Sequence, residues 1–479
     1  MNRKIFIYLF ILNFFCTFVK AQNASGSATL SYATHQLESV TFHQPEDIPN
    51  NWIRFFKDPT PNIDPNVVVN PLDYVSPYVD KTVAYTTTDQ QPVAYASGCI
   101  GVVSAEFTSN CEGRSFYVKG EGIEGFNLKP QLVKVVNGKF TYPKTEFSGP
   151  IFPSINRKFE NLKVRHFPNF TIKWSISDKT TGTYKQIGKS NNPLYVTHKK
   201  PINTYVIHSF LFISCKSADN KNIEDDVMST IYDDFTDQCV KKYNGSKCMG
   251  YWVEPKPPQG GTAVGLCFTG IALIAWENAT CGAWADLHVE LVKAQGLNYI
   301  ELVGVSWTDN TQLAFNSQEF LDLETDVVAF FGNLSPNLSA VGSSNLGLRA
   351  DFYVNNYNFP DGFHSFYLNE KEVIPSFILP NGKILKSINQ QGVKGQNNPD
   401  PRSHFENHAI TKNIKNSKYY DPSYGTALVN DATQWKNGNI AGFGTRLKYI
   451  HILPSGQITE YQVSWVGYST TQKTILFNK

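Results

Sequence analysis

Apolar and polar residues alternate in short runs along residues 93–197, and this pattern predicts a β-rich region. Clusters of Gly, Asn and Pro separate the runs, as turns do between neighbouring strands. Residues 174–197 predict a hairpin that turns at Asp178–Gly182. The clearest strand-like runs are residues 116–118, 132–136 and 170–176.

The pattern changes after residue 201. Residues 204–215 predict a strand, and residues 222–240 then predict a polar helix whose apolar residues recur four apart. Residues 281–295 also have helical periodicity, and Gly296 is placed to end that helix. The apolar stripes of the two helices consist of Val227, Ile231, Phe235 and Cys239, and of Trp284, Leu287, Leu291 and Ala294.

Together these segments predict an α+β protein built from successive regions. Residues 22–92 are rich in Pro, Asn, Asp and Thr and predict an irregular or loosely β region. Residues 93–200 predict a β-sandwich, for which an immunoglobulin-like fold is the expected identity. Residues 201–479 predict a mixed domain of helices and strands.

The chain begins with a basic tetrapeptide, Met1–Lys4, followed by an apolar run, Ile5–Val19. A bilayer span needs about 20 apolar residues, whereas this length and order are typical of a secretory signal. We interpret residues 1–21 as a signal peptide and expect a secreted, periplasmic or cell-surface protein. The longest later apolar stretch, residues 262–276, contains two glycines and predicts a buried segment, so no integral membrane span is expected.

The charge balance narrows the class of partner. Lys and Arg total 43 against 41 acidic residues, and this near-neutral balance predicts no basic surface for nucleic acid or for an anionic membrane. We expect neither as a partner. The charged fraction of 18% and the aromatic fraction of 14% are typical of a β-rich globular protein.

The chain has eight cysteines, of which Cys16 lies within the expected signal peptide. The other seven cannot all pair, so the expected partition in an oxidising compartment is three disulfides and one free thiol. Many connectivities are open, and proximity in sequence favours only two pairs, Cys99 with Cys111 and Cys239 with Cys248. The unpaired thiol is a candidate for chemistry or for an intermolecular link.

Cys281 lies in the first turn of the helix predicted over residues 281–295, where Asn278 or Thr280 can cap the start. Unpaired backbone N–H groups and the positive end of the helix dipole favour a thiolate there. The same N–H groups can hold the oxyanion of a tetrahedral intermediate. Most cysteines of exported proteins have a structural use instead. The helix position and the odd count favour Cys281 as a nucleophile.

A nucleophilic thiol needs an imidazole as base and a third group that orients the imidazole. Residues 403–425 predict two short strands around the polar turn Asn413–Asn416. If the turn is symmetric, His408 and Asp421 face each other across the antiparallel pair, with Cβ atoms about 5 Å apart. We therefore predict His408 as the base and Asp421 as its orienting acid.

The spacing of histidines in the sequence suggests two alternatives, a different partner for Cys281 and a zinc site. His288 is seven residues beyond Cys281, about 10.5 Å along a helix axis, and is interpreted as a histidine at the edge of the core. His404 and His408 are four apart, but a zinc site needs helical spacing and further ligands, which the strand-like residues between them do not provide. We expect neither a metal nor another cofactor.

Three short blocks resemble the transglutaminase-like superfamily of thiol enzymes. They are the helix start C-G-A-W-A-x-L at Cys281, the tripeptide Asn407–Ala409 and the run Y-Y-D-P-S-Y-G at Tyr419–Gly425. The resemblance covers roughly residues 204–425. It implies a papain-like α+β core, in which a helix carrying the thiol packs on an antiparallel sheet carrying base and acid. Cys281, His408 and Asp421 match the family's nucleophile, base and orienting residue.

Two features depart from the family pattern. Ala279 and Thr280 precede the cysteine where the family often has Gly-Gln, so the side chain that would help to hold the oxyanion is undefined. The interval between Cys281 and His408 is long, which predicts an insertion over about residues 308–401.

The resemblance implies chemistry at an acyl group through a thioester. We expect hydrolysis of an amide bond in a protein or peptide substrate, as in a cysteine peptidase, because water alone completes the second half-reaction. An alternative is a protein-glutamine γ-glutamyltransferase that cross-links or deamidates its substrate. A different class of function is a non-catalytic surface adhesin or binding protein with a degenerate core.

Overall fold

The computed structural model describes most of the chain between residues 34 and 478, and its first described residue lies beyond the expected signal peptide. The described ranges are 34–43, 53, 55–59, 82–86, 92–98, 101–146, 163–203, 206–251, 269–307, 394–399, 404–405, 407–426, 430–452, 458–467 and 475–478, with short strands between 338 and 385. Strands and helices are both abundant, so the chain has an α+β fold. Within these residues no helix is long and apolar enough to cross a membrane.

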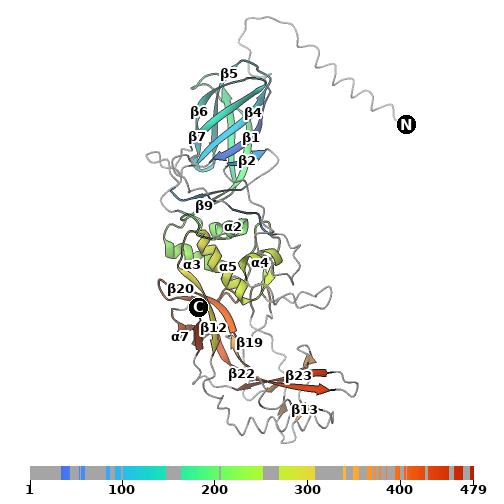
Figure 1. The fold of residues 1–479 in the computed structure, drawn as a ribbon. Coiled ribbons are helices and arrows are strands. Elements are labelled where there is room, and N and C mark those ends of the chain that lie inside the picture. Colours follow the sequence, from blue (N-terminus) through green and yellow to red (C-terminus); the bar gives the residue numbers. More distant parts are fainter. Residues whose placement is uncertain are drawn as a thin grey trace, which may run out of the picture.

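Two β-sheets face each other at the N-terminal end of the molecule (Figure 1). Their inner faces meet around the buried Trp174, whose ring lies 5.6 Å from that of Phe107 and 5.2 Å from that of Tyr142. The first sheet has the order β2 (Thr82–Thr86), β1 (His35–His43), β4 (Val102–Ser109) and β7 (Lys139–Glu146). The second has the order β3 (Val93–Ala96), β9 (Lys185–Thr197), β8 (Arg165–Ser177), β5 (Ser115–Gly122) and β6 (Asn127–Lys134).

The strand predictions for this region are confirmed. The runs 116–118 and 170–176 lie in β5 and β8, the run 132–136 overlaps the end of β6, and β8 and β9 form the predicted hairpin. The sheets also extend beyond the region expected from the sequence. Strand β1 pairs with β4 through residues 35–43, and Leu37, Val40 and Phe42 on β1 are buried. The first sheet therefore crosses the expected boundary between residues 92 and 93.

A layer of four helices follows the sandwich in the chain and lies next to it in space (Figure 1). The polar helix expected over residues 222–240 is confirmed as α3 (Glu224–Thr236). Val227, Ile231 and Phe235 of its predicted apolar stripe are buried, whereas Cys239 lies beyond the end of the helix and is half-buried. The helix expected over residues 281–295 is confirmed as α5 (Cys281–Ala294), and Gly296 follows it with a positive φ of 72°. The other two helices are α2 (His208–Ser217) and α4 (Gly270–Trp276).

The strand predicted over residues 204–215 is wrong, because this segment forms helix α2. Most residues of α2 are buried, so the helix has no apolar stripe that sequence periodicity could reveal. Its N-terminus is held by a residue far away in the chain. The Ser209 N–H and Oγ donate to the two carboxylate oxygens of Asp58, at 2.8 and 2.6 Å. This cap satisfies backbone groups that are otherwise left without a partner at a helix start.

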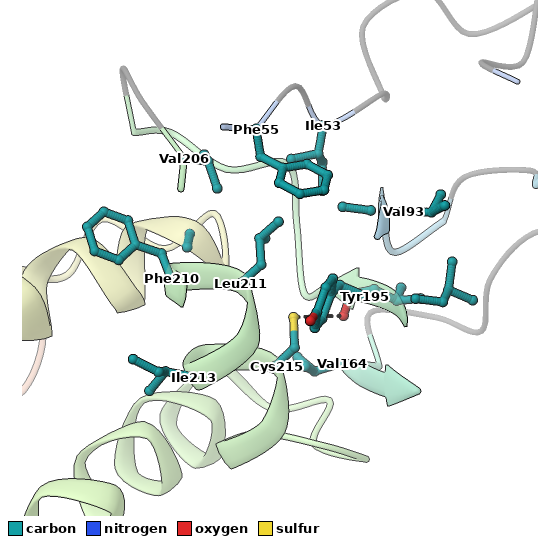
Figure 2. Close-up of a cluster of buried hydrophobic side chains, with 14 of the residues drawn as sticks. Ile53, Phe55, Val93, Val164, Tyr195, Val206, Phe210, Leu211, Ile213 and Cys215 are labelled. Atoms are coloured by element: carbon teal, nitrogen blue, oxygen red, sulfur yellow. Dashed lines mark hydrogen bonds between the residues drawn. The ribbon is translucent and has the colours of Figure 1, made fainter. Parts of the chain in front are cut away.

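The segment that carries Asp58 joins the sandwich region to the helical layer. The Phe56 N–H donates to the Val206 carbonyl, and the Phe56 carbonyl accepts a bond from His208 N–H, both at 2.8 Å. Figure 2 shows Ile53 and Phe55 beside Val206 and Leu211 in one buried apolar cluster. The N-terminal residues are therefore part of the same core as the helices.

Helix α5 packs on a sheet with the order β21 (Tyr419–Tyr420), β20 (Asn407–Asn413), β12 (Ile300–Trp307) and β24 (Ile475–Asn478). The sheet is antiparallel throughout. Strand β12 follows α5 directly in the chain, whereas β20 and β24 come from much later in the sequence. Tertiary structure thus brings α5 together with strands from much later in the sequence.

A second large sheet lies beyond this one, at the end of the molecule opposite the sandwich (Figure 1). Its strands include several from the insertion expected over residues 308–401, paired with a long C-terminal hairpin. Helix α7 (Ala432–Asn439) precedes that hairpin. The sheet consists of β16 (Glu372–Val373), β15 (His364–Leu368), β23 (Ile458–Gly467), β22 (Ile440–Ile452), β14 (Arg349–Val354) and β19 (His404–Phe405), with β13 (Leu338–Ala340) on β22; β17 (Phe377–Ile378) and β18 (Ile384–Leu385) form a separate pair.

Two histidines are buried in the helical layer as neutral rings. His208 Nε2 lies 2.9 Å from the Tyr195 hydroxyl, and His288 Nδ1 lies 2.8 Å from the Thr411 hydroxyl. Burial lowers the pKa of each ring to about 3, and His166 lowers that of His208 further in the same direction. Both rings therefore remain unprotonated in the native protein well below the ordinary histidine pKa of 6.5.

We expect the protein to lose stability steadily on acidification below pH 6.5. An unfolded chain protonates these two histidines there, whereas the native state resists until its own lower pKa is reached. Each histidine lowers the free energy of unfolding by about 1.4 kcal/mol per pH unit in this window. Thermal unfolding between pH 7 and pH 4 measures the slope. A His208→Gln variant, which cannot titrate, should have a shallower slope; an unchanged slope would contradict the assignment.

Candidate active site

Cys281 is the first residue of α5, as the sequence predicts. Thr280 stands at the N-cap with an extended backbone, although its side chain makes no capping hydrogen bond. The two residues before it form β11 (Asn278–Ala279), which pairs in parallel with β10 (Gly250–Tyr251). The cysteine as a whole is half-buried, so the fold holds it in place.

His408 lies on β20 and is buried, with 1% of its surface exposed. Its Nε2 atom lies 2.8 Å from Oδ2 of Asp421, which is completely buried. A carboxylate in this position fixes the imidazole tautomer and stabilises the imidazolium. The same histidine interacts with the Cys281 thiol closely enough to lower the pKa of that thiol. The structure thus brings together all three side chains predicted from the sequence, with His408 in the middle.

The hairpin that carries His408 and Asp421 has a different register from the predicted one. Thr411 pairs with Tyr420, and Lys412 pairs with Tyr419, so His408 and Asp421 are not directly opposite each other. Asp421 comes one residue after β21 and approaches His408 diagonally. Diagonal neighbours in an antiparallel pair are still within reach of long side chains. The predicted contact is therefore present, although the predicted pairing was wrong.

The turn explains the shift in register. Asn413 belongs to the strand, and its backbone N–H donates to the Lys418 carbonyl at 2.8 Å. The Asn413 side chain accepts a bond from Lys415 N–H at 2.9 Å, and Ser417 has a positive φ of 58°. The loop consequently lies one residue later than the predicted turn at Asn413–Asn416. An asparagine that lies in the strand can hydrogen-bond to the turn with its side chain. The sequence alone does not distinguish it from an asparagine that lies in the turn itself.

The charges of the site favour a thiolate paired with an imidazolium. Burial would raise the pKa of Cys281, but hydrogen bonding and charge interaction with His408, together with a bond from Ala409 N–H, bring it below 9.0. Burial would likewise lower the pKa of His408, but Asp421 and then Cys281 raise it well above 6.5. The two shifts have one cause, because each charged form stabilises the other.

Asp421 is held by backbone and side-chain contacts that the sequence did not reveal. Its N–H donates to the Tyr232 hydroxyl at 3.1 Å, and that hydroxyl donates to the Thr426 carbonyl at 2.6 Å. Its Oδ1 atom accepts a bond from Ser423 N–H at 3.2 Å. Tyr232 lies on α3, far away in the chain, so no local signal marks it as a neighbour of the acid.

His288 has a structural position rather than a place beside the thiol. It is completely buried among the rings of Tyr232, Phe235 and Tyr420, at centroid distances of 5.3 to 5.4 Å. The prediction that His288 lies at the edge of the core was therefore wrong, because the residue is completely buried. Its bond to Thr411 joins α5 to β20. The helix that carries the thiol and the strand that carries the base are thus fixed to each other about two turns away from Cys281.

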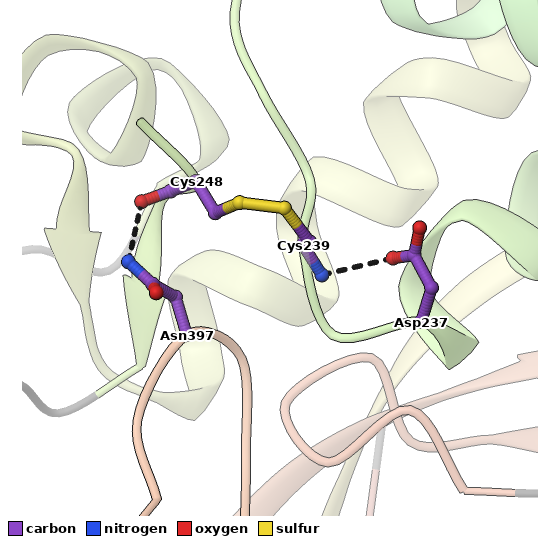
Figure 3. Close-up of a disulfide and its surroundings, with 4 residues drawn as sticks. All are labelled: Asp237, Cys239, Cys248 and Asn397. Atoms are coloured by element: carbon purple, nitrogen blue, oxygen red, sulfur yellow. Dashed lines mark hydrogen bonds between the residues drawn. A yellow bond between two sulfur atoms is a disulfide. The ribbon is translucent and has the colours of Figure 1, made fainter. Parts of the chain in front are cut away.

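The cysteines divide differently from the expected three disulfides and one thiol. Cys239 and Cys248 form a disulfide, as their proximity in sequence predicts (Figure 3). Cys111, Cys215 and Cys281 are all free, so the suggested bridge from Cys111 to Cys99 is not formed. Cys99 itself lies outside the described residues, as does Cys267.

The free thiols differ strongly in their surroundings. Burial raises the pKa of the Cys215 thiol to about 12, even though Gln295 donates to its sulfur at 3.3 Å. Cys111 lies on the sandwich, away from the helices. Cys281 alone among these three interacts with a histidine that lowers the pKa of its thiol. The environment of the thiol, rather than the cysteine count, identifies the candidate nucleophile.

Comparison with known proteins adds no assignment. No protein-family model matches the sequence, and no curated protein matches it. Among the residues that the structure describes, no cluster of three or more His, Cys, Asp or Glu side chains is arranged to hold a metal ion. A thiol, an imidazole and a buried carboxylate in this order are able to perform nucleophilic attack and proton transfer.

Proposed function

We propose that this protein is an exported thiol enzyme of the transglutaminase-like kind, which acts on amide bonds of a protein or peptide. The observation that carries the proposal is the grouping of Cys281, His408 and Asp421: the thiol stands at the start of α5, His408 lowers its pKa, and Asp421 is hydrogen-bonded to His408. The order of these residues, and a helix packed on an antiparallel sheet, support a papain-like core. The two-sheet sandwich is consistent with the immunoglobulin-like domain proposed from the sequence.

The first half-reaction breaks the amide bond and forms a thioester. The Cys281 thiolate attacks the carbonyl carbon, and the carbonyl oxygen becomes an oxyanion near the first backbone N–H groups of α5. The C–N bond then breaks, and the imidazolium of His408 gives its proton to the leaving nitrogen. Asp421 keeps the imidazole oriented throughout, because it accepts a bond from Nε2 and leaves Nδ1 for the thiol.

The second half-reaction transfers the acyl group to water. His408, now neutral, removes a proton from the water as its oxygen attacks the thioester carbon. The C–S bond breaks, and the products are a carboxylic acid and the restored thiolate–imidazolium pair. An amine acceptor in place of water gives an isopeptide bond by the same steps. We favour water, since it needs no second binding site.

A three-part assay separates these outcomes. The protein is incubated with casein, a glutamine-rich protein, and with a fluorescent primary amine, and three products are measured: new peptide N-termini, ammonia, and fluorescence bound to casein. We expect new N-termini with little bound fluorescence. Bound fluorescence that depends on Cys281 would replace hydrolysis by cross-linking. If none of the three products depends on Cys281, the protein is not an enzyme of this kind, and a binding function replaces it.

A further inference from the structure

A short segment of the insertion, residues 394–399, lies against the site and is called the strap here. Its third residue, Gln396, is completely buried. The strap contacts three parts of the molecule that are far from it in sequence: the end of α3, strand β10 and the turn that follows Asp421. None of these contacts was predicted from the sequence, because Gln396 belongs to no periodic element or motif.

The Gln396 side chain joins the turn after Asp421 to helix α3. Its Nε2 atom donates to the Phe235 carbonyl at 2.7 Å and to the Pro422 carbonyl at 2.8 Å. Two carbonyl acceptors require two N–H donors, which the amide nitrogen of glutamine supplies from one atom. Pro422 follows Asp421 directly. The Gln396 amide thus holds the residue next to the acid at a fixed distance from the end of α3.

The Gln396 backbone joins the same turn to the strand beside the nucleophile. Gln396 N–H donates to the Ser423 carbonyl at 3.0 Å, and the Gln396 carbonyl accepts from Tyr251 N–H at 2.8 Å. Tyr251 lies on β10, which pairs with β11 immediately before Cys281. One buried residue therefore connects the acid side of the site to the thiol side.

The rest of the strap is fixed as well. Asn397 N–H donates to the Gln238 carbonyl at 2.9 Å, and its side chain donates to the Cys248 carbonyl at 2.7 Å, beside the disulfide (Figure 3). Asn398 donates to the Tyr251 carbonyl at 2.9 Å. The turn also lies close against the end of α3, because a side chain at Gly425 would collide with the Phe235 carbonyl. The strap and the end of α3 thus both contact the turn.

We propose that Gln396 is a positioning residue that sets the Asp421 carboxylate against His408. This inference rests on the proposed function, since it assigns Gln396 a part in the same reaction. Without the Gln396 amide, the Pro422 carbonyl loses its donor and the turn relaxes away from α3. Asp421 then stabilises the imidazolium less well, and His408 lowers the pKa of the Cys281 thiol by less.

The test compares Gln396→Met with a matched control, Gln295→Met. The methionine side chain has nearly the same length as that of glutamine but has no N–H donor. Gln295 is also completely buried, and its Nε2 also donates twice, to Ser214 Oγ at 2.7 Å and to Cys215 Sγ at 3.3 Å. It lies at the other end of α5, away from the thiol. Both variants should have a lower melting temperature.

The readout is the pH at which Cys281 reacts half-maximally with iodoacetamide. We expect the midpoint of Gln396→Met to rise by about one pH unit, which makes alkylation near neutral pH about tenfold slower. The midpoint of Gln295→Met should stay at the wild-type value. If Gln396→Met fails to fold, Gln396→Glu replaces it, because glutamate keeps the shape of glutamine and its side chain has no N–H donor.

His408→Ala serves as the reference for the proposed function itself. If His408→Ala shifts the midpoint and Gln396→Met does not, the positioning role is wrong and the catalytic proposal stands. If wild type and His408→Ala have the same midpoint, the catalytic proposal fails and the positioning role fails with it. A midpoint shift in Gln295→Met equal to that of Gln396→Met would show a general effect of core destabilisation and would also overturn the assignment.

Discussion

Replacing Cys281 with alanine is expected to abolish turnover, with a loss on the order of 10⁶-fold in kcat, as for removal of the nucleophile from other catalytic triads. The thiol is the only group in the site that forms the bond to the acyl carbon, so neither His408 nor Asp421 can substitute for it. The variant should fold, because alanine fits within the space of cysteine and Cys281 is only half-buried. The measurement is the casein assay, with circular dichroism to show that the variant is folded.

Cys111→Ser is the matched control for this experiment. Cys111 is also a free and half-buried thiol, but it lies on the β-sandwich. Its replacement should leave turnover unchanged. Equal turnover by wild type and Cys281→Ala would remove Cys281 from the reaction. A loss in Cys111→Ser comparable to that in Cys281→Ala would mean that the wrong thiol has been assigned.

The parts of the fold that were predictable from the sequence are those in which one face of an element is buried. Helices α3 and α5 have a clear apolar stripe, and strands β5, β6 and β8 are separated by turn residues. Helix α2 was missed because it is buried nearly all round and because its cap comes from Asp58, about 150 residues earlier. Local pattern carries no information about a cap supplied by tertiary structure.

The three candidate site residues were predicted from the sequence, whereas the residues that hold them in place were not. Cys281, His408 and Asp421 were found because a helix start and a hairpin place them where chemistry needs them. The register of the hairpin was wrong, since Asn413 acts from inside the strand. The support from the odd number of cysteines also weakened, because three described cysteines are free. The lowered pKa of Cys281 now supports the assignment in place of that count.

Tyr232 and Gln396 could not have been found by the same reasoning. Both form hydrogen bonds with the backbone around Asp421. Almost every residue type has the same backbone donor and acceptor, so the sequence does not indicate which backbone groups have such partners. Both also come from segments that are more than 20 residues away from the acid. Contacts of this kind are set by how α3 and the strap pack, which is a property of the tertiary structure alone.

Replacing His408 with alanine is expected to reverse the pKa shift of Cys281. In the wild type, the bond and charge interaction with His408 outweigh burial and hold the pKa of the thiol below 9.0. Without the imidazole, burial and the negative charge of Asp421 remain, and both raise the pKa. The thiolate fraction at neutral pH falls by up to tenfold for each unit by which the pKa rises. Turnover falls further still, because the leaving nitrogen also loses its proton donor.

The most direct test of the central claim, that His408 activates Cys281, is the pH profile of iodoacetamide alkylation at Cys281. The rate is followed by mass spectrometry of the peptide that contains this residue, in wild type and in His408→Ala, and Cys111 is followed in the same samples as an internal reference. We predict a half-maximal rate below pH 9.0 in the wild type and above pH 9.0 in the variant, with Cys111 unchanged. Coincident profiles for Cys281 in the two proteins would contradict the claim.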